Sequence, residues 1–149
     1  MKILIIGGNG TIGKPVVAHF KEQNEVLIAG RSSGNITVDI ANSNSISKMF
    51  QKIGNVDAII CIAGEAKWAN FNELEEEDYH LGLNSKLMGQ VNLVRIGQNY
   101  LNTGGSITLS TGILADDPVV KTTSAAMVNG GIHSFVMAVA LEIENNIRV

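Results

Sequence analysis

A glycine-rich segment near the N-terminus carries the clearest chemical signal in the sequence. It reads Gly7-Gly8-Asn9-Gly10-Thr11-Ile12-Gly13, a GxxGxxG pattern that follows an apolar run and opens an amphipathic segment. In a strand–turn–helix setting, such glycines permit a tight turn, let backbone N–H groups approach a pyrophosphate and let the helix pack closely on the sheet. The helix N-terminus adds partial positive charge toward the same phosphates. The segment therefore predicts dinucleotide binding through Gly7, Gly10, Thr11, Ile12 and Gly13, with a ligand-free glycine turn as the alternative.

The residues at the end of the second apolar run indicate which dinucleotide to expect. Sites that prefer NAD usually carry an acidic residue there, which bonds the ribose hydroxyls. The segment here is Ala29-Gly30-Arg31-Ser32-Ser33, without a carboxylate. Arg31 can pair with a 2′-phosphate through its planar guanidinium, and Ser32 can donate a hydrogen bond. We therefore expect NADP as the cofactor, with NAD less favoured; a solvated loop arginine is the alternative interpretation of Arg31.

These residues need a scaffold that brings strand ends together. Short apolar runs alternate with longer amphipathic segments, a pattern typical of strand, crossover helix and parallel strand units. Strands are expected at residues 2–6, 25–29, 36–38, 58–62 and 106–109. Helices are expected at residues 11–21, 43–53, 73–101 and 124–144. The sequence thus predicts a single α/β domain over residues 1–149, with a Rossmann-type, doubly wound parallel sheet.

The last three residues of the chain indicate whether the sheet has a further strand. Residues 147–149 have the character of a sixth strand, and no polar tail follows them. We therefore expect the C-terminal strands to be truncated and the domain to be incomplete at this end.

Composition narrows the classes of partner. The net charge is −3, and lysines and arginines form no cluster, which argues against nucleic acid or an anionic membrane surface. No apolar stretch approaches the roughly 20 residues of a membrane-spanning helix, and the N-terminus does not have the pattern of a signal sequence. Cys61 is the only cysteine, so neither an internal disulfide nor a multi-cysteine metal site is expected. We expect core packing for Cys61, a small-molecule partner, no metal and a cytoplasmic location.

Several short motifs beyond the glycine loop have counterparts in one known family. They are Val38-Asp39-Ile40, Cys61-Ile62-Ala63-Gly64, Leu83-Asn84-Ser85-Lys86 and Leu109-Ser110-Thr111-Gly112. With the glycine loop, they resemble the short-chain dehydrogenase/reductase superfamily along essentially the whole chain. The resemblance implies that Asp39 and Ile40 line the adenine pocket and that Ala63 and Gly64 border the nucleotide. It also implies that Asn84 helps organise a proton relay and that Thr111 is the catalytic hydroxyl.

The resemblance fails at the family's catalytic pair. In this family a tyrosine is the acid/base, and a lysine one helical turn later lowers the tyrosine pKa and holds the nicotinamide ribose. Alignment of the last helix puts Ala125 at the tyrosine position and Asn129 at the lysine position. The usual general acid is absent. The candidate catalytic set is Thr111, Asn84 and Asn129, which would polarise a carbonyl through hydrogen bonds.

The source of the proton is open at this point. His133 and Lys121 are candidate replacements, although a surface position is the ordinary expectation for each. Lys86 is two residues from Asn84, about 200° round an ideal helix, and is expected to point elsewhere. Water or an unidentified group would then supply the proton.

Functions from two classes fit these observations. One is an NADP(H)-dependent oxidoreductase acting on a small carbonyl or alcohol. The other is a non-catalytic NADP(H)-binding sensor or regulator, favoured by the missing tyrosine and lysine. A separate possibility is that the chain is a fragment that lacks its substrate lid. Family members pair through two long helices, here about residues 77–101 and 124–144, so a homodimer or homotetramer is expected.

Overall fold

The computed structural model describes residues 1–149 and is built around a five-stranded, all-parallel sheet. The strands are β1 (Lys2–Ile6), β2 (Glu25–Gly30), β3 (Ile36–Thr37), β4 (Val56–Cys61) and β5 (Leu101–Leu109). Their spatial order is β3-β2-β1-β4-β5, so the chain moves outward from β1 first in one direction and then in the other. This is the doubly wound Rossmann arrangement, and the predicted fold class is confirmed.

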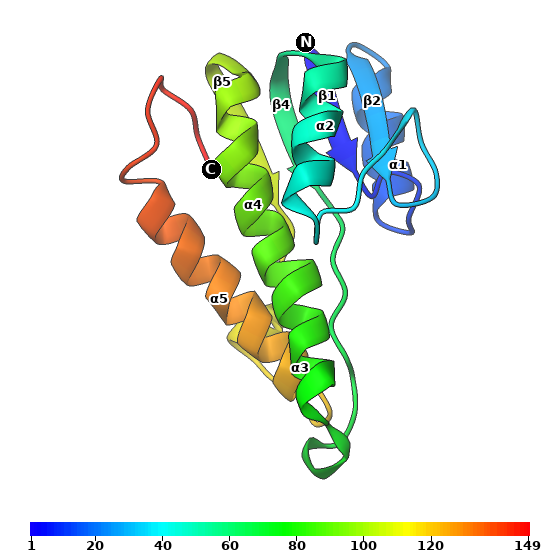
Figure 1. Cartoon of the computed structure of the whole chain (residues 1–149), viewed down its shortest axis with the longest axis vertical. Helices are drawn as coiled ribbons and strands as arrows, with labels where there is room; N and C mark the ends of the chain where they lie inside the picture. The colour runs from blue at the N-terminus through cyan, green and yellow to red at the C-terminus, as the bar shows by residue number, and fades with distance from the viewer.

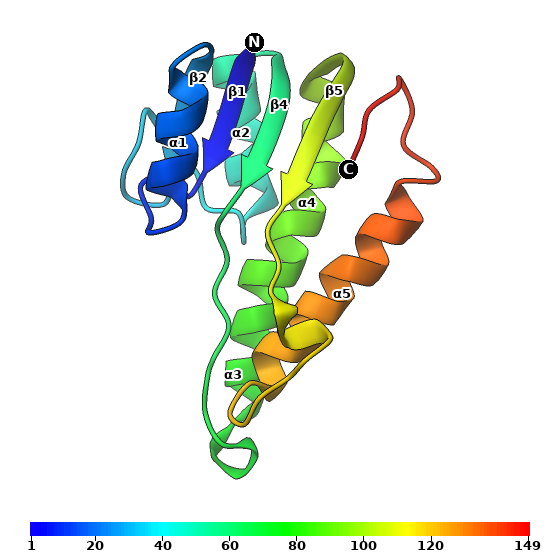
Figure 2. The same ribbon diagram turned by 180° about the vertical axis from the view of Figure 1, so that it is seen from behind.

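Helices cover both faces of the sheet. They are α1 (Gly13–Lys21), α2 (Ser43–Ile53), α3 (Glu76–Gly82), α4 (Met88–Gly97) and α5 (Thr123–Val139). Figure 1 shows α2 and α4 in front of the sheet, and Figure 2 shows α1 on the opposite face. No helix of the chain combines the length and the apolar character needed to cross a membrane.

The central strands are apolar because both of their faces are covered. The residues of β1 from Ile3 to Ile6 are at most 1% exposed. Phe50 of α2 and Leu93 of α4 are fully buried in the core on one face of the sheet. Cys61 belongs to the same core, as predicted, and its burial raises the pKa of the thiol to about 11. The thiol is therefore a neutral packing group.

Local sequence signals set the ends of α2. The side chain of Asn42 accepts hydrogen bonds from the backbone N–H groups of Asn44 and Ser45, which caps the helix start. Gly54 follows the last helical residue with a φ of +68°, a conformation that favours glycine. Both ends of this helix agree with the prediction.

The long helix expected over residues 73–101 is divided. A short 3₁₀ turn occupies Phe71–Glu73, and α3 begins only at Glu76. A π-helical turn over Leu83–Leu87 joins α3 to α4, and a 3₁₀ turn over Gln98–Tyr100 ends this helical segment. Because a π turn closes with i→i+5 hydrogen bonds, side chains after it no longer follow the 100° step of an α-helix.

Two further boundaries differ from the prediction by five residues each, and the remaining ones by at most two. β5 begins at Leu101 instead of residue 106, because Gly104 adopts a φ of +80° and the strand continues through an irregular register. α5 ends at Val139 instead of residue 144, and Asn145 and Asn146 then turn the chain with positive φ angles. Arg148 forms a parallel bridge to Ser106 beside β5.

Candidate functional site

The glycine loop links the carboxyl end of β1 to the start of α1. Gly7 has a φ of +83°, and a Cβ atom there would lie 2.5 Å from the carbonyl oxygen of Ile62. A Cβ atom on Gly13 would lie only 2.2 Å from the carbonyl oxygen of Gly7. A Cβ atom on Gly10 would meet only that same oxygen, at 3.3 Å. Gly7 and Gly13 are therefore required by packing, whereas Gly10 leaves room beside the loop.

Two backbone donors are free where the loop enters α1. The N–H groups of Thr11 and Ile12 donate no hydrogen bond within the chain. They immediately precede the first residue of α1, whose N-terminus has no side-chain cap. Unpaired N–H groups at this end of a helix attract anions, because the helix dipole adds partial positive charge.

A cavity of about 480 Å³ lies beside this loop, at the carboxyl ends of β1, β2 and β4. The strand order reverses between β1 and β4, and open α/β sheets bind ligands at such switch points. The lining contains most of the sequence-predicted nucleotide residues, namely Gly7, Gly10, Arg31, Ser32, Asp39, Ile40, Ala63 and Gly64. Thr11, Ile12 and Gly13 lie outside this lining, at the junction of the loop with α1.

The loop that carries Asp39 is held in place by its own hydrogen bonds. The Asp39 carboxylate accepts a hydrogen bond from the N–H of Ala41 at 3.1 Å, and the Asp39 N–H donates to Ser45 Oγ at 3.0 Å. Ile40 is buried against the helix at Gly89, where an added Cβ atom would lie 2.9 Å from Ile40 Cγ1. The wall expected to face the adenine is therefore rigid.

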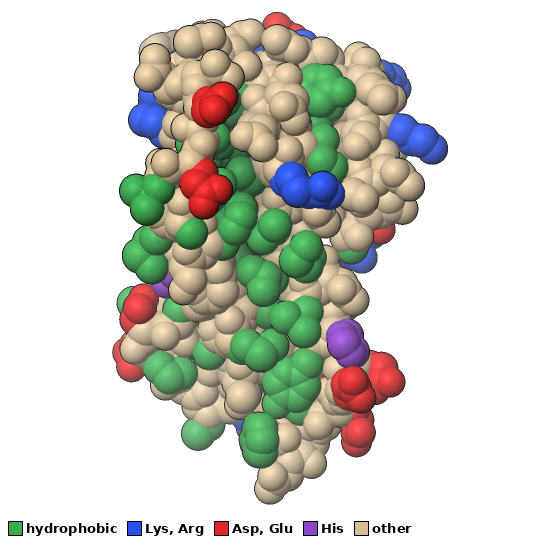
Figure 3. Space-filling view, turned by 60° about the vertical axis from the view of Figure 1, so that its left-hand side comes forward, with side chains coloured by type: hydrophobic (Ala, Val, Ile, Leu, Met, Phe, Trp, Pro, Cys, Tyr) green, Lys and Arg blue, Asp and Glu red, His purple; other side chains and the backbone are tan.

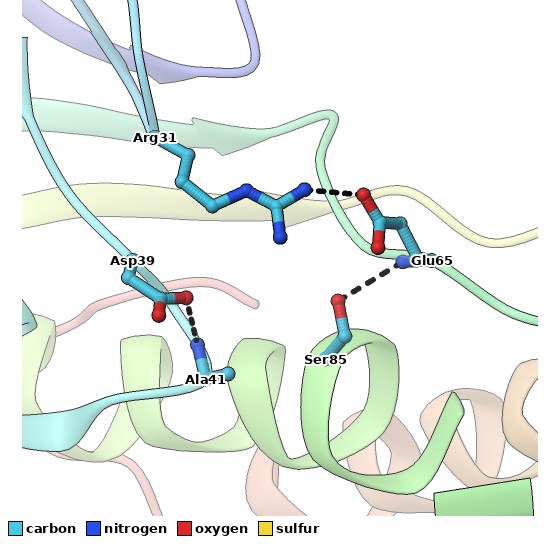
Figure 4. Close-up of polar contacts among 5 residues, drawn as sticks. All are labelled: Arg31, Asp39, Ala41, Glu65 and Ser85. Atoms are coloured by element: carbon cyan, nitrogen blue, oxygen red, sulfur yellow. Dashed lines mark hydrogen bonds and ion pairs between the residues drawn. The ribbon is translucent and has the colours of Figure 1, made fainter. Parts of the chain in front are cut away.

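A carboxylate faces Arg31 in the same cavity. The Arg31 guanidinium forms an ion pair with Glu65, 34 positions later in the chain (Figure 4). The Glu65 N–H donates to Ser85 Oγ at 3.1 Å, which ties this segment to the π turn. The segment Ala29–Ser33 has no carboxylate of its own, but the fold brings the carboxylate of Glu65 against Arg31. The sheet brings the ends of β2 and β4 together on either side of β1.

A second cavity of about 370 Å³ adjoins the first, since Gly64 and Glu65 line both. Thr111 and Asn129 lie together in its lining, and Thr111 Oγ1 donates to the Asn129 carbonyl oxygen at 3.4 Å. Asn129 is 3% exposed, and its side-chain oxygen Oδ1 is buried without a hydrogen-bond partner. Because an unpaired buried acceptor is costly, this oxygen is a candidate acceptor for a hydrogen bond from a bound molecule.

Asn84 and Lys86 are placed differently from expectation. Asn84 is exposed and lines another hollow, which adjoins the first cavity at Arg31 and Asp39, so the structure does not bring it to Thr111. Lys86 lines the second cavity instead, so the expectation that it lies away from the reaction site is wrong. It does point away from Asn84, as their separation round the helix predicts; the residue placed wrongly is Asn84, which the resemblance had assigned to the site. Burial lowers the pKa of the Lys86 ammonium.

The other two candidate proton donors lie outside the second cavity. His133 Nδ1 is 3.9 Å from an Asp116 carboxylate oxygen, and His133 lines a neighbouring hollow that shares only Thr111 with the second cavity. Lys121 is exposed, with a φ of +71°, and is not among the lining residues. Sequence reasoning missed Glu65, Ser85 and Trp68 as lining residues; Glu65 directly follows the Ala63-Gly64 motif and Ser85 lies within the Leu83–Lys86 motif, whereas Trp68 had no local signal.

The doubly wound sheet, the glycine loop and the cavity at the switch point define a Rossmann domain of the dinucleotide-binding type. A family model described as Enoyl-(Acyl carrier protein) reductase matches residues 14–149. The chain belongs to the short-chain dehydrogenase/reductase superfamily.

Solved structures agree with this assignment. The protein lin1944 from Listeria innocua is 46% identical, with a TM-score of 0.97 over 99% of this chain and 74% of that chain. A small-chain dehydrogenase in complex with NADPH is 30% identical, with a TM-score of 0.92 over 100% of this chain and 67% of that chain. No curated protein matches the sequence.

The glycine loop yields a paired prediction. Gly13→Ala forces a methyl group against backbone atoms that cannot move aside, so we expect a loss of about 3 kcal/mol in the free energy of unfolding. For Gly10→Ala we expect a loss of less than about 1 kcal/mol in the free energy of unfolding, because the added methyl group would lie farther from the Gly7 carbonyl oxygen. Urea unfolding followed by circular dichroism measures both. Equal losses in the two variants would contradict the packing role given to Gly13.

Proposed function

We propose that this protein binds NADP(H) in the first cavity and uses it to reduce a small carbonyl compound, or oxidise the alcohol, in the second. The observation that carries the proposal is the junction of the two cavities at Gly64 and Glu65. A dinucleotide held by the glycine loop would extend from one cavity to the other. A cytoplasmic location belongs to the same proposal, supported by the single cysteine Cys61.

The residues present fit such a cofactor. Free N–H groups of Thr11 and Ile12 would bind the pyrophosphate, and Ile40 would contact the adenine. The unpaired Asn129 Oδ1 would accept a hydrogen bond from a ribose hydroxyl. When bound, the nicotinamide nucleotide supplies or accepts the hydride. Thr111 would hold the substrate oxygen by donating its hydroxyl hydrogen.

The preference for NADP(H) depends on Arg31. Its ion pair with Glu65 is solvent-exposed, with side chains 66% and 50% accessible, so the pair contributes about 0–1 kcal/mol. A phosphate offers Arg31 a charge-assisted, bidentate contact that is stronger than this exposed pair. The 2′-phosphate would therefore displace Glu65 from Arg31. The NADPH complex of the 30% identical small-chain dehydrogenase supports this cofactor.

A non-catalytic NADP(H) sensor is the second candidate, and one observation favours it. Ala125 is 4% exposed and lines the second cavity at the position of the family's tyrosine. Its methyl group cannot donate a proton there. Consumption of NADPH with a carbonyl substrate would exclude this candidate, whereas unequal affinity for NADPH and NADP⁺ without turnover would support it.

The cofactor proposal predicts opposite effects at the two ends of the ion pair. We expect Arg31→Ala to weaken NADPH binding about tenfold or more, because it removes the charge-assisted contact. We expect Glu65→Gln to strengthen NADPH binding by up to about fivefold, because the 2′-phosphate then has no ion pair with Glu65 to displace from Arg31. NADH binding should change little in either variant. Isothermal titration with NADPH and NADH measures these constants.

Two results would count against the cofactor proposal. Equal losses of affinity for NADPH and NADH in Arg31→Ala would show that Arg31 does not contact the 2′-phosphate. Failure of the folded native protein to bind either nucleotide would overturn nucleotide binding itself.

We also propose that the chain forms a homodimer or homotetramer through its long helices. α5 has no charged residue other than His133 in its 17 positions, although one side of it is not covered by the chain. Figure 3 shows hydrophobic side chains gathered along this side of the molecule. Exposed apolar side chains on the three neighbouring helices α3, α4 and α5 include Leu81, Met88, Met127 and Met137. Apolar faces of this kind are usually buried by a partner.

If the chain self-associates through this apolar face, charged substitutions on the face should lower the molar mass of the protein in solution. The double variant Met88→Glu/Met127→Glu should shift the protein from an oligomer to a monomer in light scattering after size exclusion, because unpaired buried carboxylates are costly. Val120→Glu, at an exposed apolar position in the loop before α5, is the matched control and should stay oligomeric. A monomeric native protein would contradict the proposal.

A further inference from the structure

Lys86 occupies the second cavity in an unusual state for a lysine. The π turn places its backbone against Gly64, where an added Cβ atom would lie 2.9 Å from Lys86 Cα and 3.0 Å from its Cγ. The side chain is half-buried and lines the cavity together with Thr111 and Asn129. Its ammonium makes no hydrogen bond or ion pair within the chain. The charge is therefore desolvated without being paired.

No other group in this cavity is suited to donate a proton. Ala125 has no polar side-chain atom, and Thr111 is an aliphatic alcohol, which can donate a hydrogen bond but is too weak an acid to release its proton. Glu65 is the only other ionisable residue in the lining, and its side chain is 50% accessible and lies at the junction with the first cavity, on the side of Arg31. The nearby Cys61 thiol lies behind the cavity, buried and neutral. Lys86 alone combines an acidic hydrogen with access to the cavity.

We propose that Lys86 donates the proton to the carbonyl oxygen of a substrate held in the second cavity, in place of a tyrosine. This rests on the proposed function. As hydride bonds to the carbonyl carbon, the π electron pair moves to oxygen, and oxygen takes a proton from Lys86 Nζ. The N–H electrons remain on nitrogen, the carbonyl is reduced to an alcohol, and the nicotinamide is oxidised. Solvent then reprotonates the amine.

The surroundings suit Lys86 to this role. Burial lowers the pKa of its ammonium, and a general acid works best when its pKa approaches the working pH. The acid form exists below that pKa, so kcat for reduction should fall as pH rises through it. Two titratable groups lie near the ammonium: Glu65, at the junction with the first cavity, and Cys61, whose burial raises the pKa of its thiol to about 11. Trp68 and Leu114 line the remaining wall, which fits a carbonyl compound with an apolar substituent.

The first test compares three variants with the native protein. Lys86→Met keeps the length of the side chain without its charge, and Lys86→Arg keeps a charge that does not release a proton. Lys67→Met is the control, because Lys67 belongs to the segment that lines the second cavity but is itself exposed, with its Nζ 3.8 Å from an Asp78 carboxylate oxygen. Reduction of a panel of aldehydes and ketones by NADPH is followed, with NADPH binding measured separately.

We expect Lys86→Met and Lys86→Arg to lose about 100-fold or more in kcat, while their dissociation constants for NADPH stay within about twofold. Lys67→Met should match the native protein. A raised KM with unchanged kcat would overturn the proposal, because Lys86 would then only bind substrate. Lack of turnover by the native protein would contradict the oxidoreductase function and the proposal with it.

A second readout does not depend on turnover. The Cε signals of ¹³C-labelled lysines are titrated by NMR in the NADPH and NADP⁺ complexes. The oxidised nicotinamide ring is positive, so the pKa of Lys86 should be lower in the NADP⁺ complex, whereas that of Lys67 should be equal in both. Equal Lys86 values in the two complexes would overturn the proposal alone. Failure of both nucleotides to bind would instead contradict the proposed function.

Discussion

The site depends on the close approach of two backbone segments, the Gly7 carbonyl and the Cα of Gly13. A methyl group at residue 13 would lie 2.2 Å from that oxygen, so only glycine lets α1 start this close to the end of β1. The approach fixes where the N-terminus of α1 lies and leaves the N–H groups of Thr11 and Ile12 unpaired beside the cavity. The anion-binding character of the loop follows from this packing.

The remaining parts of the site come from separate strand ends that the parallel sheet collects at one edge. Arg31 follows β2, Glu65 follows β4 and Thr111 follows β5. The strand order reverses between β1 and β4, which opens the first cavity at this edge. Gly64, with a φ of +128°, turns the chain after β4 so that it passes against the π turn. The same residue therefore borders both cavities and links nucleotide binding to the candidate site of reaction.

Features that depend on short stretches of sequence could be predicted. The glycine loop lies between a strand and a helix as its pattern indicates, and Asn42 and Gly54 bound α2 because each acts on adjacent backbone groups. The alternation of apolar and amphipathic segments was sufficient to predict the doubly wound fold. Apolar character also identified Cys61 as a core residue.

Features that depend on contacts between distant segments could not be predicted in this way. Glu65 reaches Arg31 only after β1 has been placed between their strands, so a local reading of residues 29–33 overlooked the carboxylate. Lys86 was placed away from the site because the resemblance assigned Asn84 to the site and the two residues lie on different sides of the helix. Which of these sides faces the second cavity depends on how the helix packs against the segment after β4, and periodicity alone does not give that packing.

The most direct test of the account is an NMR titration of the ¹⁵N-labelled protein with NADP⁺. If the nucleotide spans the two cavities, the largest shifts will occur at the backbone amides of Thr11 and Ile12 and at the side-chain amide of Asn129. The first two report the pyrophosphate, and the third reports a ribose hydroxyl bonded to the buried amide oxygen. Shifts confined to other surfaces, or shifts at the loop without any change at Asn129, would contradict the claim that one dinucleotide joins the glycine loop to the second cavity.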